Sequence, residues 1–351
     1  MIQGQSKTEL NYRAIQTDSS SSLKDFSMDR KKYYKKYVLG ESVEDKENQA
    51  ATIGKLVETL LLEPHEFDNR FYMSACASTP TGLMLDFVEA LYTVTKEATD
   101  QFGIITKSFE ELSREAYVMS GFKIKYEQVI NKFIGSDAEI YYNEIRKVRS
   151  QNLTVVDTKD VTNAENIVEE LRNNPFTRDI VNRVSDSRYT VVNQLQIEDY
   201  VVENHHFKSM LDMVHVDHET QTIQIYDLKC TWSVENFYTE YYLYRRSYIQ
   251  AYLYLCAIIS LTREDANHKW FGYEVNYPQF IVCDSTNYYS PVVYRLSDRD
   301  IQDAYAGFKH LGRKYPGVKE IIEDLKWALQ KGVWNISRKN FESNGIVKIN
   351  G

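Results

Sequence analysis

The sequence is poor in cysteine, glycine and proline. The four cysteines among its 351 residues form no CxxC pair, so neither a zinc ribbon nor an iron–sulfur cluster is indicated. Fourteen glycines and six prolines are too few for a collagen-like or low-complexity chain. The sequence also lacks a run of about 18 apolar residues and an N-terminal basic segment followed by an apolar one. We therefore expect a soluble, cytoplasmic protein with reduced thiols and no membrane contact.

Positive charge is also scarce. Lys and Arg total 42 against 50 Asp and Glu, which gives a net charge of -8 and excludes nucleic-acid binding by bulk charge, though not by a local basic channel. No GxxxxGK[ST] loop is present, so the chain has no ATP motor of its own, and no GxSxG or Cys–His pattern indicates acyl transfer. Hydrophobic residues make up 43% of the chain, which is enough for one large core or two smaller ones.

The first half of the chain is polar and then helical. Residues 1–27 contain four consecutive serines and predict a flexible polar arm. Residues 28–39 mix lysine with tyrosine, which fits either a solvated basic helix or a strip that touches a polyanion. We expect residues 28–351 to form a single domain, with a largely helical insertion at about 85–185.

The second half alternates in the manner of β-strands. Three consecutive strands are expected at 189–197, 201–216 and 221–229, followed by a long aromatic helix at 238–261. Two further strands are expected near 278–283 and near 291–297, and the C-terminal part is expected to be helical at 298–334. The first three strands are expected to form a meander. The sequence thus predicts an α/β fold in which helices surround a small mixed sheet.

Two neighbouring strands of this meander each carry an aspartate, Asp212 and Asp227. Strand alternation places Lys229 on the same face as Asp227 and turns Leu228 into the core. A short hairpin allows Asp212 to lie beside Asp227. Two close carboxylates repel each other unless a cation neutralises them, and Mg²⁺ or Mn²⁺ suits such oxygen ligands. The metal would polarise a phosphoryl oxygen while Lys229 orients or deprotonates the attacking water, which predicts phosphodiester hydrolysis.

These residues resemble the signature of the PD-(D/E)xK nucleases. The segment LDMV is followed, fifteen residues after its aspartate, by DLK, and Lys208 precedes Asp212 by four residues. Gln250 and Tyr254 form a QxxxY pair on the helix after the second motif. The segment GKLVETLLLEPHEF, residues 54–67, looks like the N-terminal helix of phage RecE-type and lambda-type exonucleases.

The resemblance implies a fold, a reaction and partners. The fold would be a restriction-endonuclease-like core with a mixed central sheet, in the order αβββαβ, with helical N-terminal and middle elaborations. The activity would be Mg²⁺-dependent DNA cleavage, with Mn²⁺ as a substitute, from double-strand ends in phage recombination or repair. The protein would then act in the host cytoplasm, as a homo-oligomeric ring, beside a single-strand annealing protein.

The resemblance also implies roles for single residues. Asp212, Asp227 and the Leu228 carbonyl would bind metal, Lys229 would position the water, Gln250 and Tyr254 would support them, and Lys208, Arg245, Arg246 and Trp232 would contact DNA. Two positions depart from the pattern. Glu58 stands where many relatives carry a metal-binding histidine, and the acidic ligand on the first strand has only Gln194, Gln196 and Glu198 as counterparts, of which we choose Glu198.

Three other interpretations stay open. Asp227 and Lys229 taken alone are also typical of an ion pair at an exposed strand end. A catalytically silent DNA-end-binding or structural phage protein could keep this fold. An endonuclease could use the same core, because the sequence does not define the preference for DNA ends.

Overall fold

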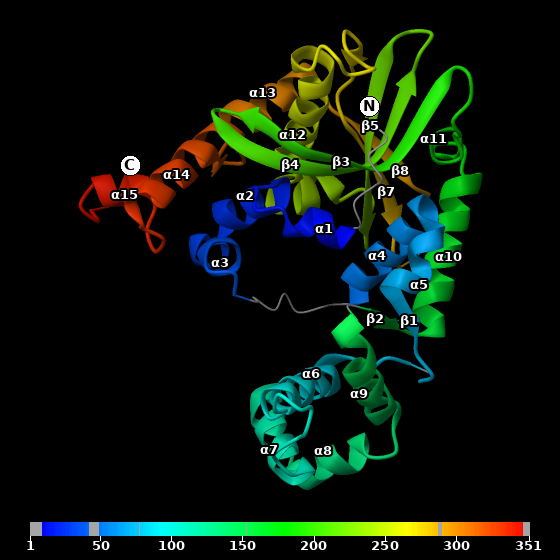
Figure 1. The fold of residues 1–351 in the computed structure, drawn as a ribbon, viewed down its shortest axis with the longest axis vertical. Helices are drawn as coiled ribbons and strands as arrows, with labels where there is room; N and C mark the ends of the chain where they lie inside the picture. Colours follow the sequence, from blue (N-terminus) through cyan, green and yellow to red (C-terminus); the bar gives the residue numbers. More distant parts are fainter. Residues whose placement is uncertain (1–8, 42–48, 77, 152, 287–289, 347–351) are drawn as a thin grey trace. The chain divides into compact units, whose positions relative to one another are not determined.

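The computed structural model describes residues 9–41, 49–76, 78–151, 153–286 and 290–346 (Figure 1). Its contacts divide the chain into two compact units. Unit 1 consists of Met1–Asn48 and Glu169–Gly351, and unit 2 consists of Gln49–Val168. The helical insertion was predicted at about 85–185, whereas unit 2 begins at Gln49.

Unit 2 is mostly helical. It contains α4 (Gln49–Leu62), the 3₁₀ turn η2 (Pro64–Glu66), α5 (Phe67–Arg70), β1 (Phe71–Met73), α6 (Gly82–Glu97), α7 (Phe109–Ser120), α8 (Tyr126–Phe133), α9 (Asp137–Val148), the 3₁₀ turn η3 (Arg149–Gln151), β2 (Thr154–Val156) and the first turns of α10 (Thr158–Asn173). Strands β1 and β2 pair in parallel. Phe87, Leu91 and Ile145 are fully buried in a core of their own, which explains the compactness of this unit.

Unit 1 is built around a mixed six-stranded sheet. Its strands are β3 (Tyr189–Val202), β4 (His205–Asp217), β5 (Thr222–Thr231), β6 (Glu274–Val275), β7 (Gln279–Asp284) and β8 (Val292–Arg295). The order is β3-β4-β5-β7-β8, with β6 paired to β5. Strands β3, β4 and β5 are antiparallel neighbours, and β5 runs parallel to β7. The predicted meander and the mixed α/β class are confirmed.

The helix that crosses the sheet is shorter than predicted. The expected helix at 238–261 is split into a π-helix, η4 (Tyr238–Tyr244), the helix α12 (Ser247–Ile259) and a second π-helix, η5 (Ser260–Glu264). Arg246 adopts a left-handed backbone conformation (φ 57°), which ends η4 before α12 begins. Helix α12 contains no glycine or proline and is buried on nearly all sides, so it packs rigidly against the core face of the sheet.

The N-terminal segment differs from the predicted flexible arm. Residues from Glu9 onward form α1 (Glu9–Ala14), α2 (Ser20–Met28), α3 (Arg30–Tyr33) and the π-helix η1 (Tyr34–Val38), whereas residues 1–8 lie outside the described part. Ser19 and Ser22 cap the start of α2 reciprocally. Leu23 and Phe26 are buried in the core of unit 1. Their burial offsets the entropy cost of ordering the segment, which was expected to keep this serine-rich segment flexible.

The C-terminal part also departs from the expected continuous helices. It contains α13 (Asp298–Ala306), the hairpin β9 (Phe308–His310) and β10 (Arg313–Tyr315), then α14 (Val318–Lys331) and α15 (Arg338–Glu342), while α11 (Arg178–Val181) precedes the sheet.

All four cysteines are free thiols, as predicted. No helix in the described part of the chain is both long enough and apolar enough to cross a bilayer.

Candidate active site

The site begins where strands β4 and β5 separate. Their backbone pairing ends at Met213 and Tyr226, so the register makes Asp212 and Asp227 the next opposed residues. The backbone N–H of Leu228 donates a hydrogen bond of 2.8 Å to Oδ2 of Asp212, so a side-chain oxygen takes the place of a strand carbonyl. The two aspartates that were predicted to be neighbours thus face each other across a split in the sheet.

Asp227 is almost completely buried. Only 1% of it is exposed, and its Oδ1 accepts a hydrogen bond of 2.8 Å from Nε2 of Gln250, while its Oδ2 forms an ion pair with Lys229. The prediction that the side chain of Leu228 turns into the core is wrong, whereas its carbonyl as a metal ligand stays a prediction. The core face of β5 carries Ile223, Ile225 and Asp227, whereas Leu228 is half-buried on the opposite face, because the aspartate rather than the leucine continues the buried side of the strand.

Gln250 connects the sheet to helix α12. The same Nε2 that contacts Asp227 lies 2.8 Å from the hydroxyl of Tyr254, one helical turn further along. Both residues are less than a tenth exposed, so their rotamers are restricted by packing. The structure therefore brings together Asp212, Asp227, Lys229, Gln250 and Tyr254, the five residues to which the sequence assigned catalytic roles.

Sequence reasoning missed a second lysine at this site. Nζ of Lys24, on α2, donates a hydrogen bond of 3.2 Å to Oε1 of Gln250. Burial, together with the charge of Lys229, lowers the pKa of Lys24 to about 8, although Asp227, Asp25 and Asp212 act in the opposite direction. The spacing of Leu23 and Phe26, three residues apart, could have signalled a packed helix here, but the serine run concealed it.

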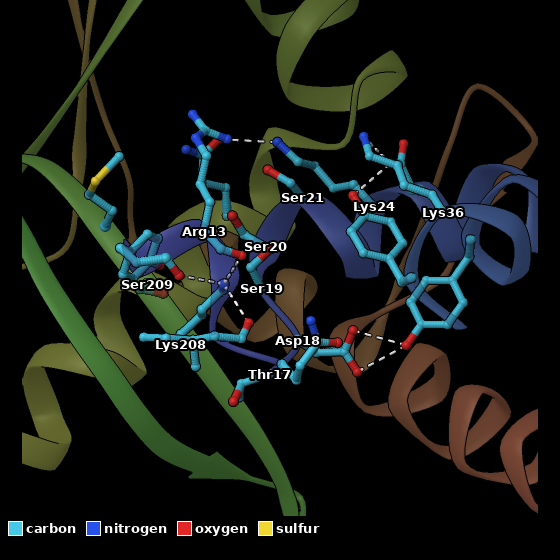
Figure 2. Close-up of a pocket in the computed structure, with 18 of the residues that line it drawn as sticks. Arg13, Thr17, Asp18, Ser19, Ser20, Ser21, Lys24, Lys36, Lys208 and Ser209 are labelled. Atoms are coloured by element: carbon cyan, nitrogen blue, oxygen red, sulfur yellow. Dashed lines mark hydrogen bonds and ion pairs between the residues drawn. The ribbon is translucent and has the colours of Figure 1, made fainter. Parts of the chain in front are cut away.

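A cavity of about 970 Å³ lies beside these residues. One wall is formed by the N-terminal segment, including Lys24, and the other by β4 and the start of α12, including Asp212 and Gln250. Figure 2 shows Arg13, Lys24 and Lys36 along this cavity. The side chains that line the cavity include five cations, Arg13, Lys24, Lys36, Lys208 and Arg245, and three carboxylates, Asp18, Asp25 and Asp212, so positive charge is in excess there, which suits an anionic ligand.

Two residues that were expected to contact DNA hold the N-terminal segment. Lys208 is 7% exposed, and its Nζ donates to the carbonyl oxygens of Tyr12 (2.8 Å), Arg13 (3.2 Å) and Ile15 (2.8 Å), at the end of α1 (Figure 2). Arg246 donates to the carbonyl oxygen of Ser27 (2.6 Å), near the end of α2. Burial lowers the pKa of both side chains. These cations therefore satisfy carbonyls at helix C-termini, and their contact with DNA stays a prediction.

Replacing Lys208 by methionine is expected to destabilise unit 1. The substitution leaves carbonyl oxygens at the end of α1 without their charged donor, which costs about 2–4 kcal/mol. Urea denaturation would measure the loss, and limited proteolysis should detect a loosened α1. Lys309→Met, at an exposed position of β9, is the matched control. A variant that kept its stability but lost DNA affinity and part of its salt dependence would support the phosphate-contact role and contradict the structural one.

The other predicted residues occupy distinct places. Arg245 is exposed, lines the cavity and stacks on the ring of Tyr241 at 4.3 Å, and Trp232 is 59% exposed just beyond β5, so their DNA contacts stay predictions. Glu198 is exposed where the register of β3 and β4 shifts. Glu58 lies half-buried on α4, in unit 2, and its role as a ligand also stays a prediction.

The donors at the site fit a hard divalent cation held partly by solvent and substrate. Within the part of the chain that the structure describes, no three His, Cys, Asp or Glu side chains form a metal cage. Mg²⁺ commonly binds through one or two carboxylates together with waters and substrate phosphates, and Asp212 and Asp227 supply such a pair. The neutralising partner of the buried Asp227 is a flexible ammonium group, which a cation can replace.

Comparison with known proteins gives a distant likeness of structure. No protein-family model and no curated protein matches the sequence. The chain is similar to the crystal structure of a protein from Eubacterium rectale that is provisionally described as an exonuclease, with 14% sequence identity and a TM-score of 0.48 over 98% of this chain and 96% of that one. Function therefore has to be argued from the side chains at the site.

Proposed function

We propose that this chain is a metal-dependent deoxyribonuclease of the PD-(D/E)xK type that hydrolyses phosphodiester bonds. The observation that supports the proposal best is the pairing register of β4 and β5, which opposes Asp212 and Asp227 at the point where the strands separate. Two carboxylates, one buried, can hold a metal, and an ammonium group beside them can orient a water, and this set is suited to metal-assisted phosphodiester hydrolysis.

Each residue then has a defined part in the reaction. Asp212 and Asp227 would hold Mg²⁺ or Mn²⁺, with the Leu228 carbonyl as a further oxygen donor. When bound, the metal supplies Lewis-acid polarisation of a phosphoryl oxygen. Lys229 orients the attacking water and stabilises the negative charge that develops on the phosphate. Gln250 fixes the carboxylate of Asp227 by the hydrogen bond described above, and Tyr254 fixes the amide of Gln250.

The preferred substrate in this proposal is double-stranded DNA with free ends. The cavity supports the anionic part of this proposal, because the cations that line it outnumber its carboxylates although the chain has a net charge of -8. Action as an exonuclease adds to the proposed cleavage the requirement that it starts from a DNA end. A phage origin, a recombination role, a single-strand annealing partner and a ring-shaped oligomer stay predictions of the family resemblance.

Degradation of end-labelled linear duplex DNA beside a covalently closed circle tests this function. Parallel reactions would contain Mg²⁺, Mn²⁺ or EDTA. We expect loss of the linear DNA alone, and only with metal. Cutting of the circle would replace the exonuclease by an endonuclease on the same core. Absence of cleavage of either DNA at both metals would contradict the proposed activity on duplex DNA.

A catalytically silent DNA-end-binding protein is the second candidate. It is favoured by one observation, namely that Lys24 and Lys229 place two ammonium groups beside the two carboxylates, so the site is charge-balanced without a metal. Thermal unfolding with and without Mg²⁺ separates the candidates. A metal-binding site stabilises the folded chain in proportion to the logarithm of the metal concentration, whereas a silent site gives no shift.

A further inference from the structure

Helix α2 delivers a second ammonium group to the proposed active site. Lys24 contacts the amide oxygen of Gln250 at 3.2 Å, and the amide nitrogen of the same residue contacts Asp227 at 2.8 Å. Lys229 is paired with the other oxygen of Asp227. Lys24 and Asp227 thus contact the same glutamine, Lys229 pairs with Asp227, and Asp212 accepts the hydrogen bond from Leu228. The formal charges of the two lysines and the two aspartates sum to zero.

The position of Lys24 is fixed by the helix that carries it. Leu23 and Phe26, on either side of it along α2, are buried in the core. The carbonyl of Ser27 accepts the hydrogen bond from Arg246, which anchors the end of the helix beside α12. Because α2 is held in this way, the ammonium group of Lys24 is directed to the site rather than free to leave with a mobile arm.

We propose that Lys24 is a built-in counter-charge that weakens metal binding in the DNA-free protein and makes metal binding depend on DNA. This inference rests on the proposed function. A divalent cation that enters between Asp212 and Asp227 meets two ammonium groups and leaves the site with an excess of positive charge. Each DNA phosphate that enters the adjacent cavity lowers that excess by one charge. By linkage, DNA then raises the affinity for the metal, and the metal raises the affinity for DNA by the same factor.

The other charged groups around Lys24 do not replace it in this role. Asp25 points to Lys32 and Lys36, at 3.0 and 3.7 Å, so its charge is already balanced by its own partners. Lys36 itself lines the cavity but pairs with Asp25. Among these neighbours it is Lys24 that contacts Gln250, so Lys24 acts on the affinity for the metal, separately from the residues that act on the water.

Metal affinity measured without turnover tests the inference. Free Mn²⁺ would be followed by electron paramagnetic resonance while it is titrated into the full chain, with and without a short duplex whose linkages are all phosphorothioate. Lys24→Gln keeps a donor for Gln250 but removes the charge, Lys24→Arg keeps the charge, and Lys31→Met removes an exposed charge from the neighbouring helix α3.

We expect Lys24→Gln to bind Mn²⁺ about tenfold more tightly than the wild type in the absence of DNA. The gain in Mn²⁺ affinity caused by DNA should shrink by the same factor. Lys24→Arg and Lys31→Met should stay within about twofold of the wild type, since both leave the charge at the site intact.

Two outcomes would overturn different statements. Equal Mn²⁺ affinity of the wild type and a folded Lys24→Gln, with and without DNA, would overturn the counter-charge role and leave the metal site in place. A folded wild type that binds no Mn²⁺ even with DNA would overturn the metal-dependent function itself. If Lys24→Gln fails to fold, Lys24→Met provides a second neutral variant, and the same change in Mn²⁺ affinity decides the question.

Discussion

Replacing Asp227 by asparagine is expected to reduce metal-dependent DNA cleavage at least about a thousandfold. Asparagine has nearly the same shape as aspartate and can still accept the hydrogen bond from Gln250, so the folded structure should persist. What disappears is the negative charge that would hold the cation and balance Lys229. The stabilisation that Mg²⁺ gives to the folded chain should therefore shrink together with the activity.

The measurement combines single-turnover cleavage of linear duplex DNA with thermal unfolding at several Mg²⁺ concentrations. Asp217→Asn is the matched control, because Asp217 lies on the same strand pair and forms an ion pair with Arg188 on the surface, away from the site. The control should cleave DNA at close to the wild-type rate. Cleavage by Asp227→Asn within tenfold of the wild type would remove Asp227 from the catalytic set.

The regular elements near the site were predictable because their patterns are local. Strand β5 alternates from Thr222 to Asp227, and the short polar turn between β4 and β5 leaves few registers, so the opposition of Asp212 and Asp227 followed from the sequence. Gln250 and Tyr254 share a helix face because they are four residues apart. The same alternation failed for Leu228, since both faces of β5 carry apolar residues and the pattern does not say which face is covered by α12.

The contribution of the N-terminal segment was not predictable from local sequence. Lys24 meets Gln250 across 226 residues, and only the folded chain brings them together. The same holds for Lys208 and Arg246, whose charges suggested DNA contacts but whose donors are used by the ends of α1 and α2. A lysine or arginine near a predicted site can thus bind either substrate or backbone, and burial decides between them.

Lys229→Met is expected to abolish cleavage as completely as Asp227→Asn but to change metal binding in the opposite direction. Loss of the ammonium group removes the residue that orients the water, which lowers the single-turnover rate at least about a thousandfold. The substitution also leaves the buried carboxylate of Asp227 without its ammonium partner, which destabilises the metal-free protein. A bound cation relieves this penalty, so Mg²⁺ should raise the melting temperature of Lys229→Met more than that of the wild type.

Lys229→Arg separates the charge of Lys229 from its action on the water. Arginine keeps the positive charge beside Asp227, so the melting temperature of Lys229→Arg should respond to Mg²⁺ as the wild type does. Its rigid guanidinium group does not lose a proton near neutral pH and places its donors differently, so cleavage should stay low. Wild-type cleavage by Lys229→Met would contradict the catalytic role. An equal Mg²⁺ response of Lys229→Met and Asp227→Asn would instead show that the cation does not bind at Asp227, because the two substitutions remove opposite charges from one ion pair.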